Sequence, residues 1–324
     1  VGGIPSRAPA VLGLIWRAEA AGVWSVQGGM HSLAQALAAV FTSLGGRLYL
    51  NTPVQQISVS SGALDGLSLR SGLRVACRQA VFNGDPAALR AGLLGRAPTR
   101  AVGRSATEPR ALSARVWTFA AQVTGAELTH HNLFFADAEA DEFAPLARGQ
   151  TPGAPTLYIC AQDRAGPTPA PSVERFQIIL NAPSCAPGAS PQSVTEAATC
   201  PTQTFDRLAR FGLTFNPHPT PAELTLPADF ARLFPASRGA LYGRSPHGAL
   251  APFLRPTART RIEGLYLAGG GTHPGAGVPM AAISGAHAAA AVLADRTSRS
   301  MFRPMATPGG ISTPSATAAT ARSP

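Results

Sequence analysis

The sequence contains no lysine, so all 27 of its basic residues are arginine. Charged residues of both signs make up only 14% of the chain, and the formal net charge is +10. Such an excess attracts nucleic acid, an anionic membrane surface or an anionic cofactor. The arginines are spread singly, without the cluster and interleaved aromatic residues typical of nucleic-acid modules. We therefore expect no nucleic-acid partner.

Cysteine is also scarce. The sequence has only four, Cys77, Cys160, Cys185 and Cys200, and none of them forms a C-x-x-C pair. These spacings suit neither a disulfide framework nor a zinc site, so we expect free thiols, a reducing compartment and no metal. A weaker metal hypothesis joins His130 and His131 to Asp137, Asp141 and Glu142. Adjacent histidines on an extended chain point to opposite faces. We interpret the stretch as a solvated acidic loop.

Long apolar runs and a leader are also missing. No run of about 18 apolar residues occurs, so no transmembrane helix is expected. Residues 1–7 do not resemble a signal peptide, and the chain opens in the middle of a pattern, as a fragment would. Residues 297–324 are rich in Pro, Ser, Thr, Ala and Gly and are predicted to be disordered.

The first hundred residues predict two helices and a β meander. Apolar spacing predicts helices over residues 7–21 and 32–44, each followed by glycine. Alternating runs then predict short strands over residues 47–50, 54–59, 64–69, 73–76 and 80–82. Pro86 is expected to begin a helix that reaches residue 94.

The middle of the chain predicts a separate α+β unit over residues 110–242. A linker over residues 95–110 precedes it, and one sheet is expected from strands 112–123, 156–162 and 175–181. A helix is predicted within residues 190–213. Several aromatic residues suit either a plain core or a tunnel for an apolar substrate, namely Trp24, Trp117, Phe134, Phe135, Phe143 and Phe253.

The most informative segment is residues 265–293. It predicts a short strand over 265–268, a glycine loop over 269–277 and a small-residue helix over 280–293. Glycines allow close approach to a ligand, and the first turn of a helix favours an anion or a carbonyl oxygen. The loop is not the G-x-G-x-x-G fingerprint. An ordinary loop before a core helix therefore remains the alternative.

Two nearby residues could instead suggest a hydrolase nucleophile or a catalytic base. Ser245 lies in Gly-Arg-Ser-Pro-His, which is not the G-x-S-x-G elbow of a hydrolase, and Pro246 blocks the required helix. His273 lies inside the glycine loop. We favour a structural or cofactor-contacting role for His273 over that of a catalytic base, and no catalytic residue is assigned.

The string Leu-Tyr-Leu-Ala-Gly-Gly-Gly-Thr-His-Pro-Gly-Ala-Gly-Val-Pro-Met at 265–280 resembles the C-terminal FAD signature of the phytoene desaturase-like (carotenoid desaturase) family, within the flavin amine oxidase superfamily. Residues 22–30, 51–54 and 81–85 are also similar to family segments. Residues 181–183 and 239–248 resemble most the desaturases of hydroxyneurosporene or methoxyneurosporene type. The resemblance covers most of residues 1–296, the C-terminal two-thirds of a family member.

The resemblance implies an α/β fold, the C-terminal part of a two-part, Rossmann-like FAD-binding domain with an inserted α+β substrate domain. Its divisions would be a substrate-domain helix at 1–21, FAD-domain parts at 22–95 and 251–296, the substrate domain at 96–250 and a tail at 297–324. The family's N-terminal ADP-binding unit is absent from this chain, so the site would be incomplete.

The resemblance also implies cofactor contacts. Gly270, Gly271 and Thr272 would lie along the FAD pyrophosphate and ribityl chain, and Val278, Pro279 and Met280 at the isoalloxazine ring. Val54 would contact adenine. The remaining predicted FAD-binding residues are Asn83, Asp85, Gly269, His273, Gly275 and Gly277.

The implied activity is desaturation of an acyclic hydroxy- or methoxycarotenoid. A hydride would pass to flavin N5, a proton would leave, and a conjugated C=C would form. The enzyme would be cytoplasmic and peripheral at the inner membrane, in an unspecified oligomeric state. Alternatives are a phytoene desaturase, another flavin amine oxidase-type oxidoreductase and an inactive fragment. Amine oxidases favour a flavin-facing lysine, which this chain lacks.

Overall fold

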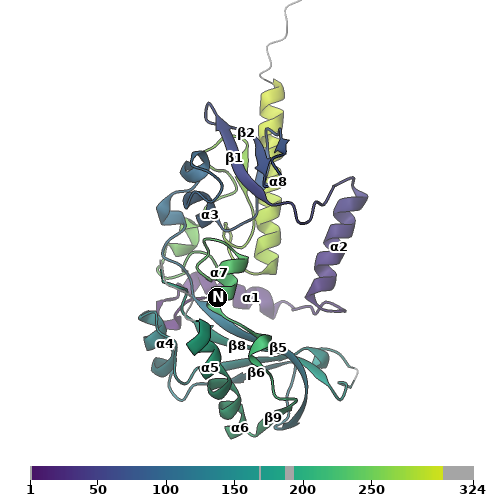
Figure 1. Cartoon of the computed structure of the whole chain (residues 1–324), viewed down its shortest axis with the longest axis vertical. Helices are drawn as coiled ribbons and strands as arrows, with labels where there is room; N and C mark the ends of the chain where they lie inside the picture. Colours follow the sequence, from purple (N-terminus) through teal and green to yellow (C-terminus); the bar gives the residue numbers. More distant parts are fainter. Residues whose placement is uncertain (1, 168, 187–192, 302–324) are drawn as a thin grey trace, which may run out of the picture.

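The computed structural model describes residues 2–167, 169–186 and 193–301 of a mixed α/β chain. Figure 1 shows a large sheet with helices α4, α5 and α6 at one end of the molecule, and β1, β2, α3 and the long helix α8 at the other. Helix α2 stands away from both parts. The chain passes between the two ends more than once, because α8 follows the sheet in sequence.

The large sheet has the order β10–β5–β8–β7–β6, with β9 also paired to β5, and every pairing is antiparallel. The three predicted strands are confirmed as neighbours within it. The strands β6, β9 and β10 are two to four residues long, too short for an alternation pattern to stand out. The bounds are β5 Ser113–Gly125, β6 His131–Phe134, β7 Leu157–Ala161, β8 Glu174–Ala182, β9 Leu213–Asn216 and β10 Leu224–Thr225.

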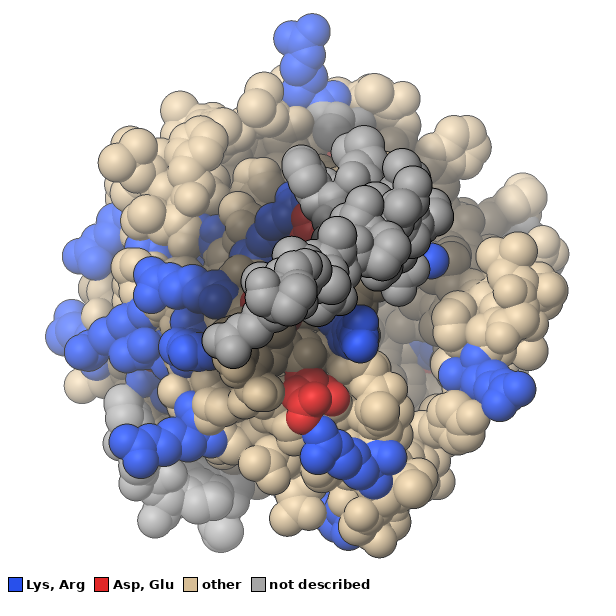
Figure 2. Space-filling model, turned by 90° about the horizontal axis from the view of Figure 1, so that it is seen from above, with Lys and Arg blue, Asp and Glu red and all other residues tan. Residues whose placement is uncertain are grey.

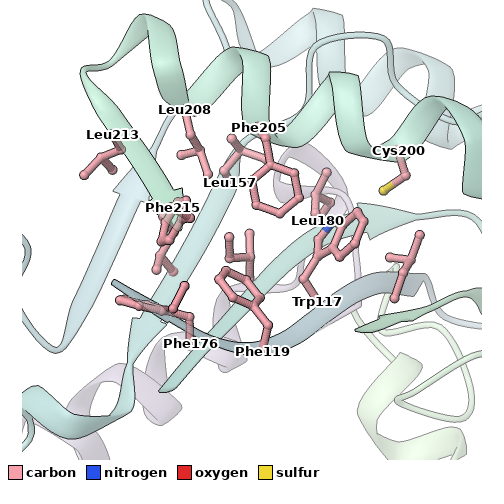
Figure 3. Close-up of a cluster of buried hydrophobic side chains, with 14 of the residues drawn as sticks. Trp117, Phe119, Leu157, Phe176, Leu180, Cys200, Phe205, Leu208, Leu213 and Phe215 are labelled. Carbon is pink, nitrogen blue, oxygen red and sulfur yellow. The ribbon is translucent and has the colours of Figure 1, made fainter. Parts of the chain in front are cut away.

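The main core lies between this sheet and the helical run α5 Ser193–Pro201, η6 Thr202–Asp206 and α6 Arg207–Arg210. Alternate residues of β5 and β8 face it, and Figure 3 shows Phe119 and Trp117 of β5 beside Phe205. Trp117 is fully buried, its ring lies 5.0 Å from that of Phe205, and its Nε1 donates to Thr204 Oγ1. Trp117 is therefore a core residue. Phe135 and Phe253 are both 68% exposed.

The predicted meander forms only in part. Strands β1 Val54–Ser60, β2 Ala63–Leu69 and β3 Arg74–Val75 make a three-stranded antiparallel sheet. The strand predicted over 47–50 is wrong, because that exposed segment has no partner strand in the described part of the chain. Strand β4 Ala80–Phe82 leaves the meander and pairs in parallel with β11 Leu265–Leu267.

The linker predicted over residues 95–110 is also wrong. It contains the short helices η3 Ala97–Ala101 and η4 Arg104–Ala106. Ala101 and Val102 are buried in a second core with Ile57 and Leu265. The charged residues and proline of the segment predict a linker, but its few apolar side chains pack between the meander and β11.

The helices differ from prediction mainly at their ends. Helix α1 spans only Gly13–Ala20 and follows the 3₁₀ turns η1 Pro5–Arg7 and η2 Ala10–Leu12, where Pro5 and Pro9 interrupt regular helix. Helix α2, Met30–Ser43, matches the prediction within two residues. Helix α3, Pro86–Arg90, is shorter than predicted. Helices not predicted are α4 Glu139–Ala147, α7 Pro227–Leu233 and the 3₁₀ segments η5 Gln162–Arg164, η7 Pro221–Glu223 and η8 Ala251–Leu254.

Helix α8 runs over Val278–Met301, so the disorder predicted for 297–301 is wrong, and residues 302–324 lie outside the described residues. Residues 278–297 are long and apolar enough, by length and composition alone, to cross a membrane. Polar residues interrupt this alanine-rich helix, so it contains no unbroken apolar run of the kind on which the sequence prediction of no transmembrane helix rests. Two buried alanines, Ala288 and Ala291, mark the face that packs on the protein.

Candidate functional site

The parallel pairing of β4 with β11 creates the candidate site. Ala80, Val81 and Phe82 lie opposite Leu265, Tyr266 and Leu267, so the two strands end side by side. The amide of Ala268 donates to Phe82 O across the junction at 3.1 Å. Since ligands of α/β proteins gather beyond the carboxyl ends of parallel strands, the loops 83–85 and 269–277 occupy the expected place.

Two glycines of the loop are required by the fold itself. A Cβ on Gly269, whose φ is +107°, would lie 2.5 Å from Asn83 Oδ1. A Cβ on Gly271 would lie 2.7 Å from Cδ of Pro86. The Pro86 ring at the start of α3 is rigid and cannot yield to a Cβ on Gly271. Asn83 could rotate away from a Cβ on Gly269, where the positive φ is the stronger demand for glycine.

Gly270 and Gly277 differ from that pair. The nearest atom to a Cβ on Gly270 would be 3.6 Å away, an ordinary contact, and none lies within 4 Å at Gly277. Protein packing therefore does not demand glycine at position 270. An open backbone surface beside a helix start is what a bound nucleotide requires.

Thr272 and Ser284 hold the loop from within. Both are 1% exposed. Thr272 Oγ1 donates to Gly269 O, while Ser284 Oγ accepts from the Gly269 amide at 2.7 Å and donates to Ala281 O. Ser284 thus fastens α8 to the glycine loop. His273 is placed by its amide, which donates to Pro256 O, and its ring stacks on that of His287.

The carboxylate of Asp85 is bound by other groups of the protein. Its carboxylate caps α3 by accepting from the Ala87 amide at 2.9 Å, and it forms an ion pair with Arg110. The side chains of Arg110 and Asp85 are 2% and 10% exposed. Nε of Arg110 also donates to Ser237 O, so this pair links the 83–85 loop to the segment before β5 and to residue 237.

Arg255 is the residue that sequence reasoning missed. Its guanidinium donates to Gly270 O at 3.1 Å, Tyr242 O at 2.8 Å and Arg244 O at 3.0 Å. Burial, followed by the charges of Arg244 and Arg110 and opposed by that of Asp85, lowers the pKa of Arg255 to about 10. Burial also lowers the pKa of Arg244. An isolated arginine in a Pro-rich stretch gives no signal of such a role.

The other predicted residues lie in two places. Val278, Pro279 and Met280 form the first turn of α8 directly after the loop, and Val278 is 54% exposed. Val54 lies at the start of β1, in the three-stranded sheet. Gly275 has a φ of +143° and lies near Arg255. The structure therefore gathers the predicted loop residues with Asn83 and Asp85, and places Val54 on another sheet.

Comparison with known proteins gives the family. The profile of the flavin-containing amine oxidoreductases matches residues 12–112. The hydroxyneurosporene desaturase of Cereibacter sphaeroides is 55% identical over 300 residues, which are 93% of this chain and 60% of that protein. The hydroxyneurosporene desaturase of Rubrivivax gelatinosus is 41% identical over 98% of this chain and 60% of that protein. The chain belongs to the carotenoid desaturase family. It spans about three-fifths of the length of these relatives.

Among solved structures, an oxidoreductase from Methanosarcina mazei is 16% identical with a TM-score of 0.44, over 82% of this chain and 54% of that one. A putative protoporphyrinogen oxidase from Exiguobacterium gives a TM-score of 0.42. The family assignment rests on the sequence relatives instead.

The site suits the flavin that membership of this family implies. Behind the loop, Arg110 forms an ion pair with Asp85, and the guanidinium of Arg255 lies within electrostatic reach of Arg244, Arg110 and Asp85. The positive charge they leave uncompensated favours an anionic group at the open side of Gly270. Arginine also dominates the charged surface in Figure 2. The described residues of this carotenoid desaturase family member thus place an open backbone position, Gly270, next to the guanidinium of Arg255.

Proposed function

We propose that this chain forms the flavin-facing and substrate-binding parts of an FAD-dependent carotenoid desaturase that acts on acyclic hydroxy- or methoxycarotenoids. The observation that carries the proposal is the β4–β11 junction, where the open backbone of Gly270 lies in front of the buried arginines. The names of the relatives that are 41% to 55% identical supply the substrate class.

The proposed architecture is a two-part FAD domain with an inserted substrate domain. It is supported by strand pairing: β4, early in the chain, joins β11, near its end, while β5 to β10 build one large sheet between them. The FAD-binding residues would be those of the glycine loop, Asn83 and the first turn of α8, with Val54 towards adenine.

The chemistry would come from the cofactor, which when bound accepts a hydride at flavin N5 while a proton leaves the adjacent carbon. The protein's own groups would bind and orient. Gly270 would admit the cofactor to the backbone, Arg255 would fix the loop that carries it, and Ser284 would hold α8 in place. Loss of the hydride would leave positive charge on the polyene, and release of the adjacent proton to water or to a base would remove that charge; we assign no side chain to that role.

We also propose that the enzyme works at the cytoplasmic surface of the inner membrane, where its apolar substrate is dissolved. Support comes from the exposed apolar side chains of residues 14–50, which include Trp16 at 73% and Trp24 at 91%. Burial of such groups in lipid, with arginine attraction to anionic headgroups, is favourable.

The test uses a chimera that places this chain behind the unmatched N-terminal region of the Cereibacter sphaeroides relative. In cells that accumulate a hydroxylated acyclic carotenoid, we expect a product whose absorption is red-shifted by further conjugation. Gly270→Ala should fold normally, because its Cβ would make only ordinary contacts with Ala276. It should bind FAD at least about tenfold more weakly, because the Cβ would take up space that we assign to the cofactor.

Gly285→Ala is the matched control, since a Cβ there meets nothing within 4 Å. A chimera that shows flavin absorbance but forms no new carotenoid would refute the proposed desaturase activity and still support the proposed flavin site. Absence of flavin from both the chimera and the 324-residue chain would instead favour the inactive fragment. Activity on phytoene alone would assign the phytoene desaturase alternative.

A further inference from the structure

The edge of the large sheet places a histidine opposite a cysteine. His131, the first residue of β6, pairs with Cys160 of β7. Residues directly opposite in an antiparallel pair project from the same face, with their Cβ atoms about 4.5–5.5 Å apart. In β7, Leu157, Ile159 and Ala161 are buried in the core, so Cys160 faces the other side of the sheet, where His131 is exposed.

His130 joins this pair, contrary to the expectation that adjacent histidines face opposite sides. Its ring centroid lies 4.1 Å from that of His131, and its Nε2 is 3.9 Å from Cys160 Sγ. The alternation rule fails because His130 precedes β6, where the chain is not regular strand. One donor atom from each of the three residues lies within 4.8 Å of the others.

The first histidine is oriented for ligation. His130 Nδ1 lies 2.9 Å from Ala161 O, and a carbonyl only accepts, so Nδ1 carries the proton. In the neutral ring this leaves the lone pair of Nε2 on the side of Cys160. A backbone carbonyl that receives the second ring N–H is the usual support of a metal-bound histidine. His131 Nδ1 is likewise fixed, 2.8 Å from Tyr158 Oη.

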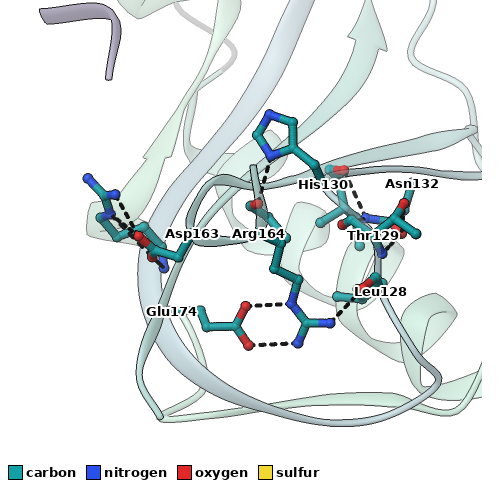
Figure 4. A network of polar contacts seen from close by, with 10 residues as sticks. Leu128, Thr129, His130, Asn132, Asp163, Arg164 and Glu174 are labelled. Atoms are coloured by element: carbon teal, nitrogen blue, oxygen red, sulfur yellow. Dashed lines mark hydrogen bonds and ion pairs between the residues drawn. The ribbon is translucent and has the colours of Figure 1, made fainter. Parts of the chain in front are cut away.

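The loop that carries His130 is held in place (Figure 4). The Thr129 amide donates to Asn132 Oδ1 at 2.9 Å, and Asn132 Nδ2 donates to Thr129 O at 2.8 Å. Arg164 donates to Leu128 O at 2.7 Å while its Nε and Nη2 bond both carboxylate oxygens of Glu174. The donor atoms would therefore need little rearrangement to bind an ion.

We propose that His130, His131 and Cys160 form a binding site for a zinc-like divalent cation. Zinc bonds of about 2.0–2.1 Å to nitrogen and 2.3 Å to sulfur place a tetrahedral nitrogen–sulfur pair about 3.6 Å apart. The separation of His130 Nε2 and Cys160 Sγ is 3.9 Å, so a small approach of the two side chains brings them to that distance. Thiolate and imidazole donors select zinc over magnesium or calcium. The ion would tie edge strand β6 to β7, with its fourth position open to solvent beside exposed His131. This site is independent of the flavin proposal.

The experiment titrates Zn²⁺ into the tag-free, chelator-treated 324-residue chain against a chromophoric competitor. We expect one equivalent of zinc to bind and to raise the unfolding temperature by mass action. Co²⁺ in its place should give a thiolate-to-cobalt absorption band. His131→Asn and Cys160→Ser should each weaken zinc binding by more than the about 10–100-fold that loss of a supporting contact costs.

His31→Asn and Cys77→Ser are the controls, a surface histidine and a partly buried thiol elsewhere in the chain. Both should bind zinc like the parent. Circular dichroism establishes that each variant retains its sheet. Equal zinc affinity in the parent and in folded Cys160→Ser, or a cobalt band that survives this substitution, would overturn the proposal.

Discussion

At the residue scale, His247 connects the first residues of the chain to the segment before β11. Its Nε2 accepts from the Ile4 amide at 2.7 Å. Burial, and next the charge of Arg7, lower the pKa of His247 from its usual 6.5. A Cβ on Gly3 would lie 2.7 Å from Pro246, so the two segments are in close contact. The neutral imidazole is thus part of this contact.

A pH dependence follows. Below pH 6.5 the unfolded chain protonates this histidine while the folded chain resists, so the free energy of unfolding falls as pH decreases from 6.5 towards the folded pKa. Above pH 6.5 the contribution is complete. We expect His247→Gln, which keeps an acceptor but cannot titrate, to reduce the loss of thermal stability between pH 7.5 and 5.5. An unchanged pH profile in this variant, matching that of His31→Gln, would contradict the assignment.

The sequence could predict part of the site at this scale and not the rest. Glycines and a helix start are local signals, and the structure does gather residues 269–280 into one loop and turn. The contacts of Arg255 and Arg110 depend on residues far away in the chain, such as Tyr242 and Ser237. Long-range hydrogen bonds leave no local pattern, so these supports became visible only in three dimensions.

At the scale of elements, long alternating or periodic segments were predictable and short ones were not. Strands β5, β7 and β8 and helix α2 carry clear periodicity. The solvated acidic loop predicted by the sequence is wrong for α4, because Glu142 is 2% exposed and accepts from Asn181 Nδ2 at 2.9 Å. The acidic composition of this segment predicts exposure to solvent, but the carboxylate of Glu142 is buried against β8, where Asn181 satisfies it.

The junction between α8 and the glycine loop gives a prediction for this scale. Ser284→Ala would leave the partly buried Gly269 amide without its acceptor, which costs about 1 kcal/mol, the lower part of the range for a buried donor. Urea denaturation should report this loss. Gly285→Ala, one position along the same helix, should instead be neutral or stabilising by up to about 1 kcal/mol. Equal stability of the two variants would argue against a fastening role for Ser284.

At the scale of the whole molecule, apolar surface is distributed unevenly. Helix α2 has no buried residue, and Leu37, Val40 and Phe41 on it are 47% to 63% exposed. Figure 1 shows this helix apart from the rest of the chain. An exposed apolar area of this kind marks an interaction surface, and the membrane is the partner proposed above.

Vesicles that contain anionic lipid provide the measurement. Two tryptophans, Trp16 and Trp24, are exposed and Trp117 is fully buried, so a blue shift of emission on binding reports the exposed pair. We expect Trp24→Ser to weaken vesicle binding by about tenfold, the loss from one large apolar side chain. Phe135→Ser, at an exposed position on the other part of the molecule, is the control. If the chain does not float with the vesicles on centrifugation, the proposed contact with the membrane is wrong.

The pairing of β4 with β11 also has a kinetic consequence. Residues 80–82 and 265–267 come from opposite parts of the chain, and contacts of such sequence separation slow folding because a long loop must close first. The strands of the large sheet lie within residues 113–225, so all of them are synthesised before β11. Nascent chains would therefore acquire the sheet before the glycine loop has a partner, and cofactor uptake would be among the last events of biogenesis.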